Sequence, residues 1–326
     1  MGNSVVQHVL TSTVPIVFHL SGRCSANPAL PLLVQCARNA YLSKYVEQVI
    51  EHFTALKHPA LPTNLDKNEC SFEWQSILLK KERLIGLLWD YCKHIQLLSS
   101  RRQRMNFNSQ NPSQTHSQNQ SLLSDSNSIE FKEFERSQLL QPLNIAVHIS
   151  SANELNHFDV RNTFDCKSFY KNSAKQSLYL LYGSLKTVNI HPSVLEQLYS
   201  VIESTVKFPG HLIARNSLIN RSTEFKNLPI RLYLCGFEDE AGEGNYLMFP
   251  IQRAVGYEKF KEVTLKLLIE CLLPHFASLK WSVYCLGIKL PNETPVMYIF
   301  YNLLSADLWV HLLLCCEASF ASISDA

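Results

Sequence analysis

One order of segments occurs twice in this 326-residue chain: two apolar strand-like runs, an amphipathic helix, and then further strands. In the first copy the strand-like runs cover 14–20 and 30–36, and a helical spacing of apolar residues follows over 41–57. Strand patterns return at 71–79 and 143–149, with a helical or mixed stretch at 83–98 between them. A repeated unit of this kind predicts two compact modules, and the chain is long enough to build both.

The second copy occupies the C-terminal third of the chain. Two strand patterns flank the acidic, glycine-rich loop "EDEAGEGN", which is a hairpin signal, and an amphipathic helix follows at 258–276. The remaining segments are a strand at 281–288, a short helix at 294–304 and a closing strand at 308–315. This order is typical of the ubiquitin-like β-grasp, in which a helix packs across a small mixed sheet. We therefore expect an α+β protein with two ubiquitin-like β-grasp domains that flank a helix-rich domain.

The domain boundaries follow from composition. From about residue 99 to about 130 the chain is dominated by Ser, Asn and Gln, and such a segment buries too little apolar surface to offset the entropy of ordering it. We expect a disordered insertion there, inside an N-terminal ubiquitin-like domain that covers 1–150. The helix-rich domain is placed at 151–225 and the C-terminal ubiquitin-like domain at 226–326.

Charge and cysteine content exclude several classes of function. The chain has 30 Lys and Arg against 28 Asp and Glu, a formal charge of +2, so nothing in its overall charge favours nucleic acid as a partner. Its ten cysteines include no CxxC pair, which indicates reduced thiols and hence the cytosol or the nucleus, and we expect a cytoplasmic protein. The histidines show no metal-ligand spacing, and no phosphate-binding loop is present. We expect no metal, no cofactor and no signal peptide or membrane span.

The segment 166–183, "CKSFYKNSAKQSLYLLYG", carries a stripe of lysines. Lys167, Lys171 and Lys175 recur every fourth residue, so they lie along one side of a helix and border an apolar face. One interpretation is that the lysine stems cover apolar surface while their ammonium groups stay in water. The other is that one amine reacts, with its pKa lowered by partial burial and a cationic neighbour. Spacing alone does not choose between Lys171 and Lys175.

Seven short segments in register give the chain a resemblance to the autophagy protein 5 family, over nearly its whole length apart from the insertion. They are "VPIVFHL" (14–20), "ARNAYL" (37–42) before "EHF" (51–53), "LIGLLWD" (84–90), "PLNIAVHI" (142–149), the Lys175 segment with Tyr182-Gly183, "LPIRLY" (228–233) and "GIKLPNETPVMYIF" (287–300).

The resemblance implies a non-enzymatic autophagy scaffold. One lysine of this family is joined through an isopeptide bond to the ubiquitin-like autophagy protein 12, and the register selects Lys175. The conjugate, with a helix of autophagy protein 16, acts like an E3 ligase. It works with the E2-like enzyme charged with autophagy protein 8 to transfer that protein to a lipid at the preautophagosomal membrane, which the complex contacts peripherally. The same register places Arg38, Gly86 and Asp90 near the groove for the autophagy protein 16 helix, where the alternative is that they are ordinary loop and helix-end residues.

Two other functions stay open at this point. A thiol enzyme of ubiquitin-like transfer or removal would need a cysteine with a low pKa, and Cys166 beside the lysines is the candidate. A scaffold that binds its ubiquitin-like partner without a covalent bond would have the same fold and no reactive lysine.

Overall fold

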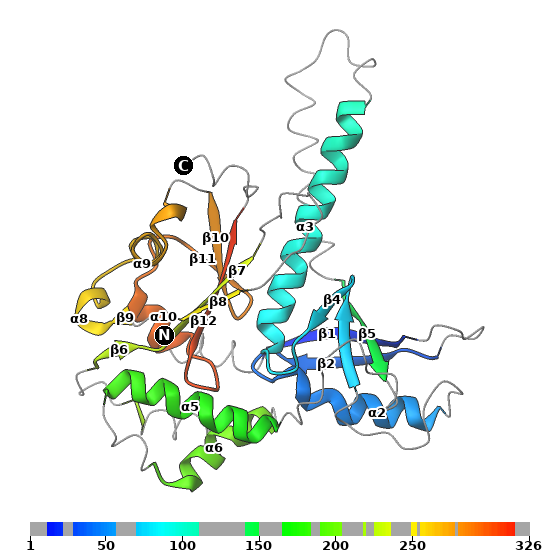
Figure 1. Cartoon of the computed structure of the whole chain (residues 1–326), viewed down its shortest axis with the longest axis horizontal. Helices are drawn as coiled ribbons and strands as arrows, with labels where there is room; N and C mark the ends of the chain where they lie inside the picture. The colour runs from blue at the N-terminus through cyan, green and yellow to red at the C-terminus, as the bar shows by residue number, and fades with distance from the viewer. Residues whose placement is uncertain are drawn as a thin grey trace.

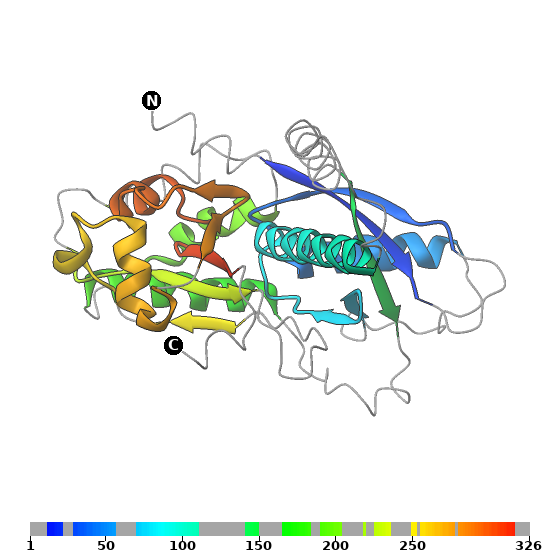
Figure 2. The same ribbon diagram turned by 90° about the horizontal axis from the view of Figure 1, so that it is seen from above.

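The fold is that of a computed structural model of the chain, shown in Figures 1 and 2. The structure describes residues 12–21, 29–56, 70–110, 141–149, 165–183, 190–203, 218–219, 225–235, 249–252, 255–277 and 280–316. Two five-stranded sheets lie side by side, each with its own helices, and the helices that follow the first sheet in the chain pack beside the second one.

The first module is built on a sheet with the strand order β2-β1-β5-β3-β4. The central strand, β5, runs parallel to β1, and the other pairings are antiparallel. The strands are β1 (Thr13–Leu20), β2 (Leu32–Ala37), β3 (Cys70–Trp74), β4 (Ile77–Leu79) and β5 (Leu143–Ile149). Its helices are the 3-10 turn η1 (Leu42–Tyr45), α2 (Val46–Ala55) and the long α3 (Ile85–Gln110), whose C-terminal half extends away from the sheets (Figure 1).

The C-terminal module repeats this topology. Its sheet has the order β11-β10-β12-β7-β8, and the last strand, β12, again lies in the centre and parallel to the first strand, β7. The strands are β7 (Ile230–Cys235), β8 (Phe249–Gln252), β10 (Trp281–Cys285), β11 (Ile288–Leu290) and β12 (Val310–Cys316), and the short pair β6 (Asn227–Leu228) and β9 (Val255–Gly256) stands apart. The helices are α8 (Tyr257–Phe260), α9 (Leu265–Leu272), the 3-10 turn η5 (Pro274–Phe276) and α10 (Val296–Asn302). The expectation of an α+β chain with two β-grasp modules is confirmed.

The helical segment between the modules contains α5 (Cys166–Tyr182) and α6 (Pro192–Glu203). Figure 1 shows the two helices below the second sheet, with α5 between that sheet and α6. Both helices lie within the segment that the sequence predicts to be rich in helix.

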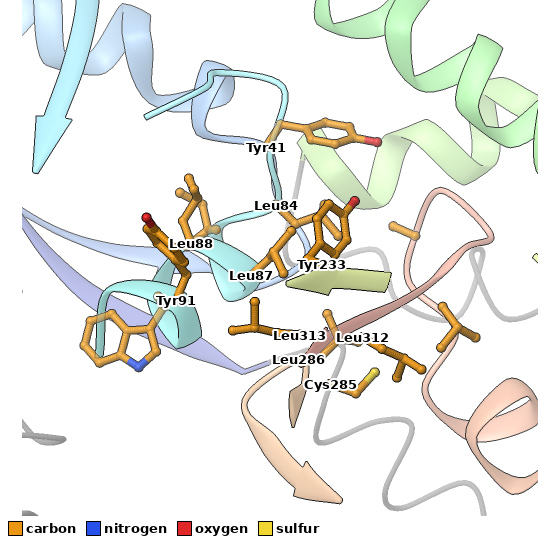
Figure 3. Close-up of a cluster of buried hydrophobic side chains, with 14 of the residues drawn as sticks. Tyr41, Leu84, Leu87, Leu88, Tyr91, Tyr233, Cys285, Leu286, Leu312 and Leu313 are labelled. Carbon is orange, nitrogen blue, oxygen red and sulfur yellow. The ribbon is translucent and has the colours of Figure 1, made fainter. Parts of the chain in front are cut away.

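Alternation of side chains decides which faces are buried. Every second residue of β3 is buried and the others are half-exposed, as a strand with one covered face requires. In contrast, β12 is buried at each position from Val310 to Cys315 because both of its faces are covered. Figure 3 shows what covers one of these faces: Leu84, just before α3, and Leu87, in its first turn, lie toward Tyr233 and Leu313 of the second sheet. The two modules therefore share one continuous core.

Two sequence-based assignments need correction in detail. The single strand expected at 71–79 is a tight hairpin, because Gln75 and Ser76 take positive φ values of 47° and 66° and turn the chain without glycine. The helix expected at 258–276 is broken after Phe260. Thr264 is extended there and pairs with Pro295, so the chain starts a new helix, α9, at Leu265.

The insertion was expected to begin at about residue 99, but α3 continues to Gln110. Extending a helix whose first turns are already packed costs little free energy, because nucleation is the unfavourable step. The Arg and Gln residues after Ser100 also have high helix propensity. Residues 111–140 lie outside the described part of the chain, so disorder there stays a prediction. Within the described residues, no helix combines the length and the apolar character needed to cross a bilayer.

Candidate functional site

The lysine stripe lies on α5, a helix with defined ends. At its start the Asp165 carboxylate accepts a hydrogen bond from the Lys167 backbone N–H at 3.0 Å, which caps the first turn. At its end Gly183 takes the left-handed conformation, with φ of 61°, and donates its N–H to the Tyr179 carbonyl at 2.7 Å. These caps set the length of the helix at 166–182 and place all three lysines inside it.

Polar side chains on the buried side of α5 fix its rotation. The Tyr170 hydroxyl donates to the Ala306 carbonyl at 2.8 Å, and the Ser177 hydroxyl donates to the Leu308 carbonyl at 2.5 Å. Between them, the Ser173 carbonyl accepts from the Trp309 indole at 2.9 Å. Three successive turns are thus bonded to the loop before β12, so the residues on the opposite side of α5 face either α6 or solvent.

The loop contact is centred on Asp307, a fully buried carboxylate. It accepts hydrogen bonds from Ser173 at 3.0 Å, Tyr41 at 3.3 Å and His311 at 3.0 Å, and Arg231 lies 3.6 Å away. Burial by itself raises the pKa of a carboxyl group, but His311, Arg231 and the Ser305 hydroxyl outweigh it and hold the pKa of Asp307 well below its usual range. Because Tyr41 belongs to the first module and Ser173 to α5, this one side chain joins all three parts of the chain.

The three lysines are not equivalent in this setting. Lys167 and Lys171 both pair with Glu196 of α6, at 2.9 Å and 2.6 Å. Lys175 is exposed, and within the described residues no ion pair or hydrogen bond holds its side chain. Tyr179, one turn further on, is also exposed, at 51%. The structure therefore separates two lysines that hold α5 against α6 from one that projects into solvent.

Another lysine has a chemically more reactive environment but is not accessible. Burial lowers the pKa of Lys93 on α3 to about 8. Its side chain is only 3% exposed, donates to the Gln141 carbonyl at 2.7 Å and lies over the Trp89 ring at 4.8 Å. An amine in this position cannot reach the C-terminus of another protein, so accessibility favours Lys175.

Arg38, Gly86 and Asp90 come together at the junction of the two modules. The Arg38 guanidinium donates to Asp90 at 3.0 Å, and the second Asp90 oxygen accepts the Gly287 N–H of the C-terminal module at 2.6 Å. Burial raises the pKa of Asp90, and Arg38 and the Gly287 N–H oppose this rise. The Gly86 N–H donates a hydrogen bond to the Arg38 carbonyl at 2.8 Å. A Cβ atom at position 86 would lie only 3.1 Å from Arg38, so glycine allows this close approach. Contact of these residues with a partner helix stays a prediction. Within the chain, the Arg38 guanidinium and the Asp90 carboxylate are already paired with each other.

The buried cysteines and Cys166 give little support to a thiol enzyme. Burial raises the pKa of the Cys36 and Cys70 thiols to about 12 and that of Cys92 well above its usual value, so these groups stay protonated. Cys166, the candidate from the sequence, is the first residue of α5 and packs its side chain against the core.

Asp307 and Glu196 were not identified from the sequence. Glu196 lies in another helix, and the pairing depends on how α5 and α6 pack. Ser173 and Ser177 could have indicated a polar contact on the buried side of this helix, because buried hydroxyl groups need hydrogen-bond partners.

Two mixed sheets of identical topology, joined through a helical segment, define this chain as a tandem ubiquitin-like protein. The family model described as "Autophagy protein ATG5, UblA domain" matches residues 9–120, and "Autophagy protein ATG5, UblB domain" matches residues 227–314. Together they span more than half of the chain, which belongs to the autophagy protein 5 family. Its role is accordingly in autophagy.

Comparison with solved structures agrees on the fold. The crystal structure of Kluyveromyces marxianus Atg5 superposes with a TM-score of 0.66 at 16% sequence identity, and the match covers 95% of this chain and 99% of that one. At this identity the likeness concerns the fold alone. No curated protein sequence matches the chain.

Proposed function

We propose that this protein is a non-enzymatic scaffold to which autophagy protein 12 is joined through an isopeptide bond at Lys175. The observation that carries the proposal is the difference among the three lysines of α5. Glu196 engages Lys167 and Lys171, whereas Lys175 is exposed on a helix whose rotation is fixed by the Asp307 contacts. An acceptor amine must enter the active site of a charged E2-like enzyme without unfolding its own helix, and Lys175 meets this condition.

In this proposal the chemistry is done to the chain and not by it. The Lys175 amine attacks the thioester that links the C-terminal glycine of autophagy protein 12 to its E2-like carrier. An amide bond forms, the carrier thiolate leaves, and the proton of the amine passes to solvent. The exposed Tyr179, on the same side of α5, offers an aromatic contact beside the new bond.

The larger assembly forms part of the same proposal. The conjugate binds a helix of autophagy protein 16 and, in the cytoplasm and at the preautophagosomal membrane, promotes transfer of autophagy protein 8 from its E2-like enzyme to lipid. Membership of the autophagy protein 5 family supports this assignment. The junction where Arg38 and Asp90 meet Gly287 is the place we propose for the partner helix, because a helix lying there would contact both modules at once.

The acceptor is tested by reconstitution with the conjugation enzymes, followed by denaturing electrophoresis in reductant and mass spectrometry of the branched peptide. We expect the adduct to disappear in Lys175→Arg and to persist in Lys171→Arg, the matched control one turn away. An adduct that survives in both variants would show that the acceptor is another residue. Co-purification of the partner without any mass shift would replace the covalent proposal with a non-covalent scaffold.

A further inference from the structure

Three side chains with metal-binding atoms meet where α3 crosses the second sheet. They are His94 of α3, Cys235 of β7 and Cys315 of β12, and their ligand atoms all lie within 4.8 Å of one another. Cys235 and Cys315 are register partners on neighbouring parallel strands, so both side chains project from the same face of the sheet. Both cysteines are fully buried, and His94 lies at the partly exposed edge of the contact.

The separation of these atoms is close to what a zinc ion requires. Zinc binds sulfur at about 2.3 Å and imidazole nitrogen at about 2.0 Å, which sets its ligand atoms roughly 3.5–3.8 Å apart in a tetrahedral site. A contraction of at most about 1.3 Å, within reach of side-chain rotation, brings ligand atoms that lie up to 4.8 Å apart to the spacing that a zinc ion requires. Two cysteines and a histidine are soft ligands of the kind that zinc selects over magnesium or calcium.

The surroundings also suit such an ion. The contact between α3 and the second sheet is lined by apolar side chains that include Leu87 and Leu313 (Figure 3). A divalent cation with two thiolates and a neutral imidazole carries no net charge, so the complete site avoids the cost of burying an isolated ion. Zinc with three protein ligands keeps a water in its fourth position, and the exposed edge beside His94 gives that water access.

We propose that His94, Cys235 and Cys315 bind one zinc ion, which joins α3 of the first module to the sheet of the C-terminal module. Binding forms two Zn–S bonds and one Zn–N bond, and the two thiol protons are released to solvent. The sequence predicted no metal because the three ligands lie far apart in the chain, and only the packing of α3 on β7 and β12 assembles them. The proposal does not depend on the acceptor function of Lys175.

A disulfide between Cys235 and Cys315 is the competing use of the same thiols. A disulfide would not involve His94, whereas a bound metal ion would use all three side chains as ligands. The two are distinguishable by intact mass, since a disulfide removes two hydrogens and no zinc is retained.

The test uses the full chain, purified in reductant, loaded with zinc chloride and dialysed, with zinc per chain measured by inductively coupled plasma mass spectrometry. We expect one zinc per chain in the wild type and a loss of at least tenfold in zinc affinity in His94→Ala and in Cys315→Ser. Cys285→Ala is the matched control, because this buried thiol donates to the Leu303 carbonyl on the other side of the same sheet. It should retain the zinc.

His94→Ala is the decisive variant, since a partly exposed site tolerates truncation better than the buried cysteines do. In a titration with cobalt(II), thiolate-to-metal charge-transfer absorption should appear in the wild type, and His94→Ala should reach half of its final absorption only at a cobalt concentration at least tenfold higher. At a hundredfold excess of zinc over its dissociation constant, the melting temperature of the wild type should rise by about 4 °C. A wild-type chain that retains no zinc overturns the proposal, and so do His94→Ala and Cys315→Ser variants that retain as much zinc as the wild type. A disulfide in the reductant-purified chain overturns it as well.

Discussion

Ser173 of α5 donates a hydrogen bond to Asp307 in the loop before β12, at 3.0 Å and across 134 residues of sequence. This bond fixes the rotation of α5 two residues before Lys175, and the same carboxylate holds Tyr41 of the first module and Arg231 of the second sheet. Presentation of the proposed acceptor therefore depends on a buried network that never touches it.

Asp307→Asn tests the importance of this network. The amide keeps the shape of the side chain but removes the charge, which leaves the largely buried Arg231 without its counter-ion. We expect a loss of about 3 kcal/mol in the free energy of unfolding, measured by urea denaturation. Glu258→Gln, which removes an exposed ion pair with Lys261, is the control and should leave the urea midpoint unchanged. Equal midpoints for the two variants would contradict the role given to Asp307.

The same carboxylate predicts a dependence of stability on pH. Its pKa is lower in the folded chain than in the unfolded chain, where a typical Asp has a pKa of about 3.9. The group therefore stabilises the fold fully above about pH 4, and this stabilisation is lost as the pH falls through that value toward the folded pKa. Between pH 6 and pH 3, the free energy of unfolding should fall more steeply in the wild type than in Asp307→Asn. Parallel pH curves for the two proteins would show that Asp307 is not responsible.

The junction of the modules is tested by Gly287→Ala. Gly287 has a φ of 87°, and a Cβ atom there would overlap the Arg38 guanidinium, so the substitution strains the backbone and displaces Arg38 from Asp90. We expect a destabilisation of about 1–3 kcal/mol by thermal or urea unfolding. Gly256→Ala is the matched control, since its φ is −59° and no atom lies within 4 Å of the added Cβ. It should be neutral, and a similar loss in both variants would argue against the junction contact.

The difference between the lysines is tested by limited acylation of the protein alone, with an amine-reactive acetyl ester and peptide mass spectrometry. Lys175 should be modified faster than Lys171, because acylation of Lys171 requires its pair with Glu196 to open. Glu196→Gln removes that pair and should raise the rate at Lys171 by roughly two- to fivefold without changing the rate at Lys175. Equal rates at both lysines in the wild type would remove the structural reason for preferring Lys175.

Much of the fold could be predicted from local patterns. The strand at 143–149 was placed correctly because its alternation and apolar content are strong, and the helix after 41 because its apolar residues recur at helical spacing. The hairpin at Gln75 and Ser76 was missed because positive φ values there are imposed by the strands on either side and carry no glycine signal. The helix at 85–110 continues beyond the apolar pattern, which ends at 98, because its first turns pack in the core.

The candidate site was only partly predictable for a different reason. Helical spacing placed the lysines on one side of α5 and its apolar residues on the other, as observed. The distinction between Lys171 and Lys175 comes from Glu196, which belongs to another helix, and the junction of Arg38 with Asp90 is completed by a backbone N–H at Gly287. Such pairings depend on tertiary packing, which local periodicity does not encode.

The place of β5 in the first sheet has a consequence for biosynthesis. This strand lies between β1 and β3, yet it is the last strand of its module to leave the ribosome. Until residue 149 has emerged, β1 and β3 each have an open edge toward the missing strand, and such edges invite pairing with other chains. The entropy of closing a flexible connection grows only slowly with its length, so the predicted disordered insertion would cost the finished protein little free energy. The insertion delays the synthesis of β5, so the incomplete module spends a longer time with exposed strand edges and depends on chaperones during that time.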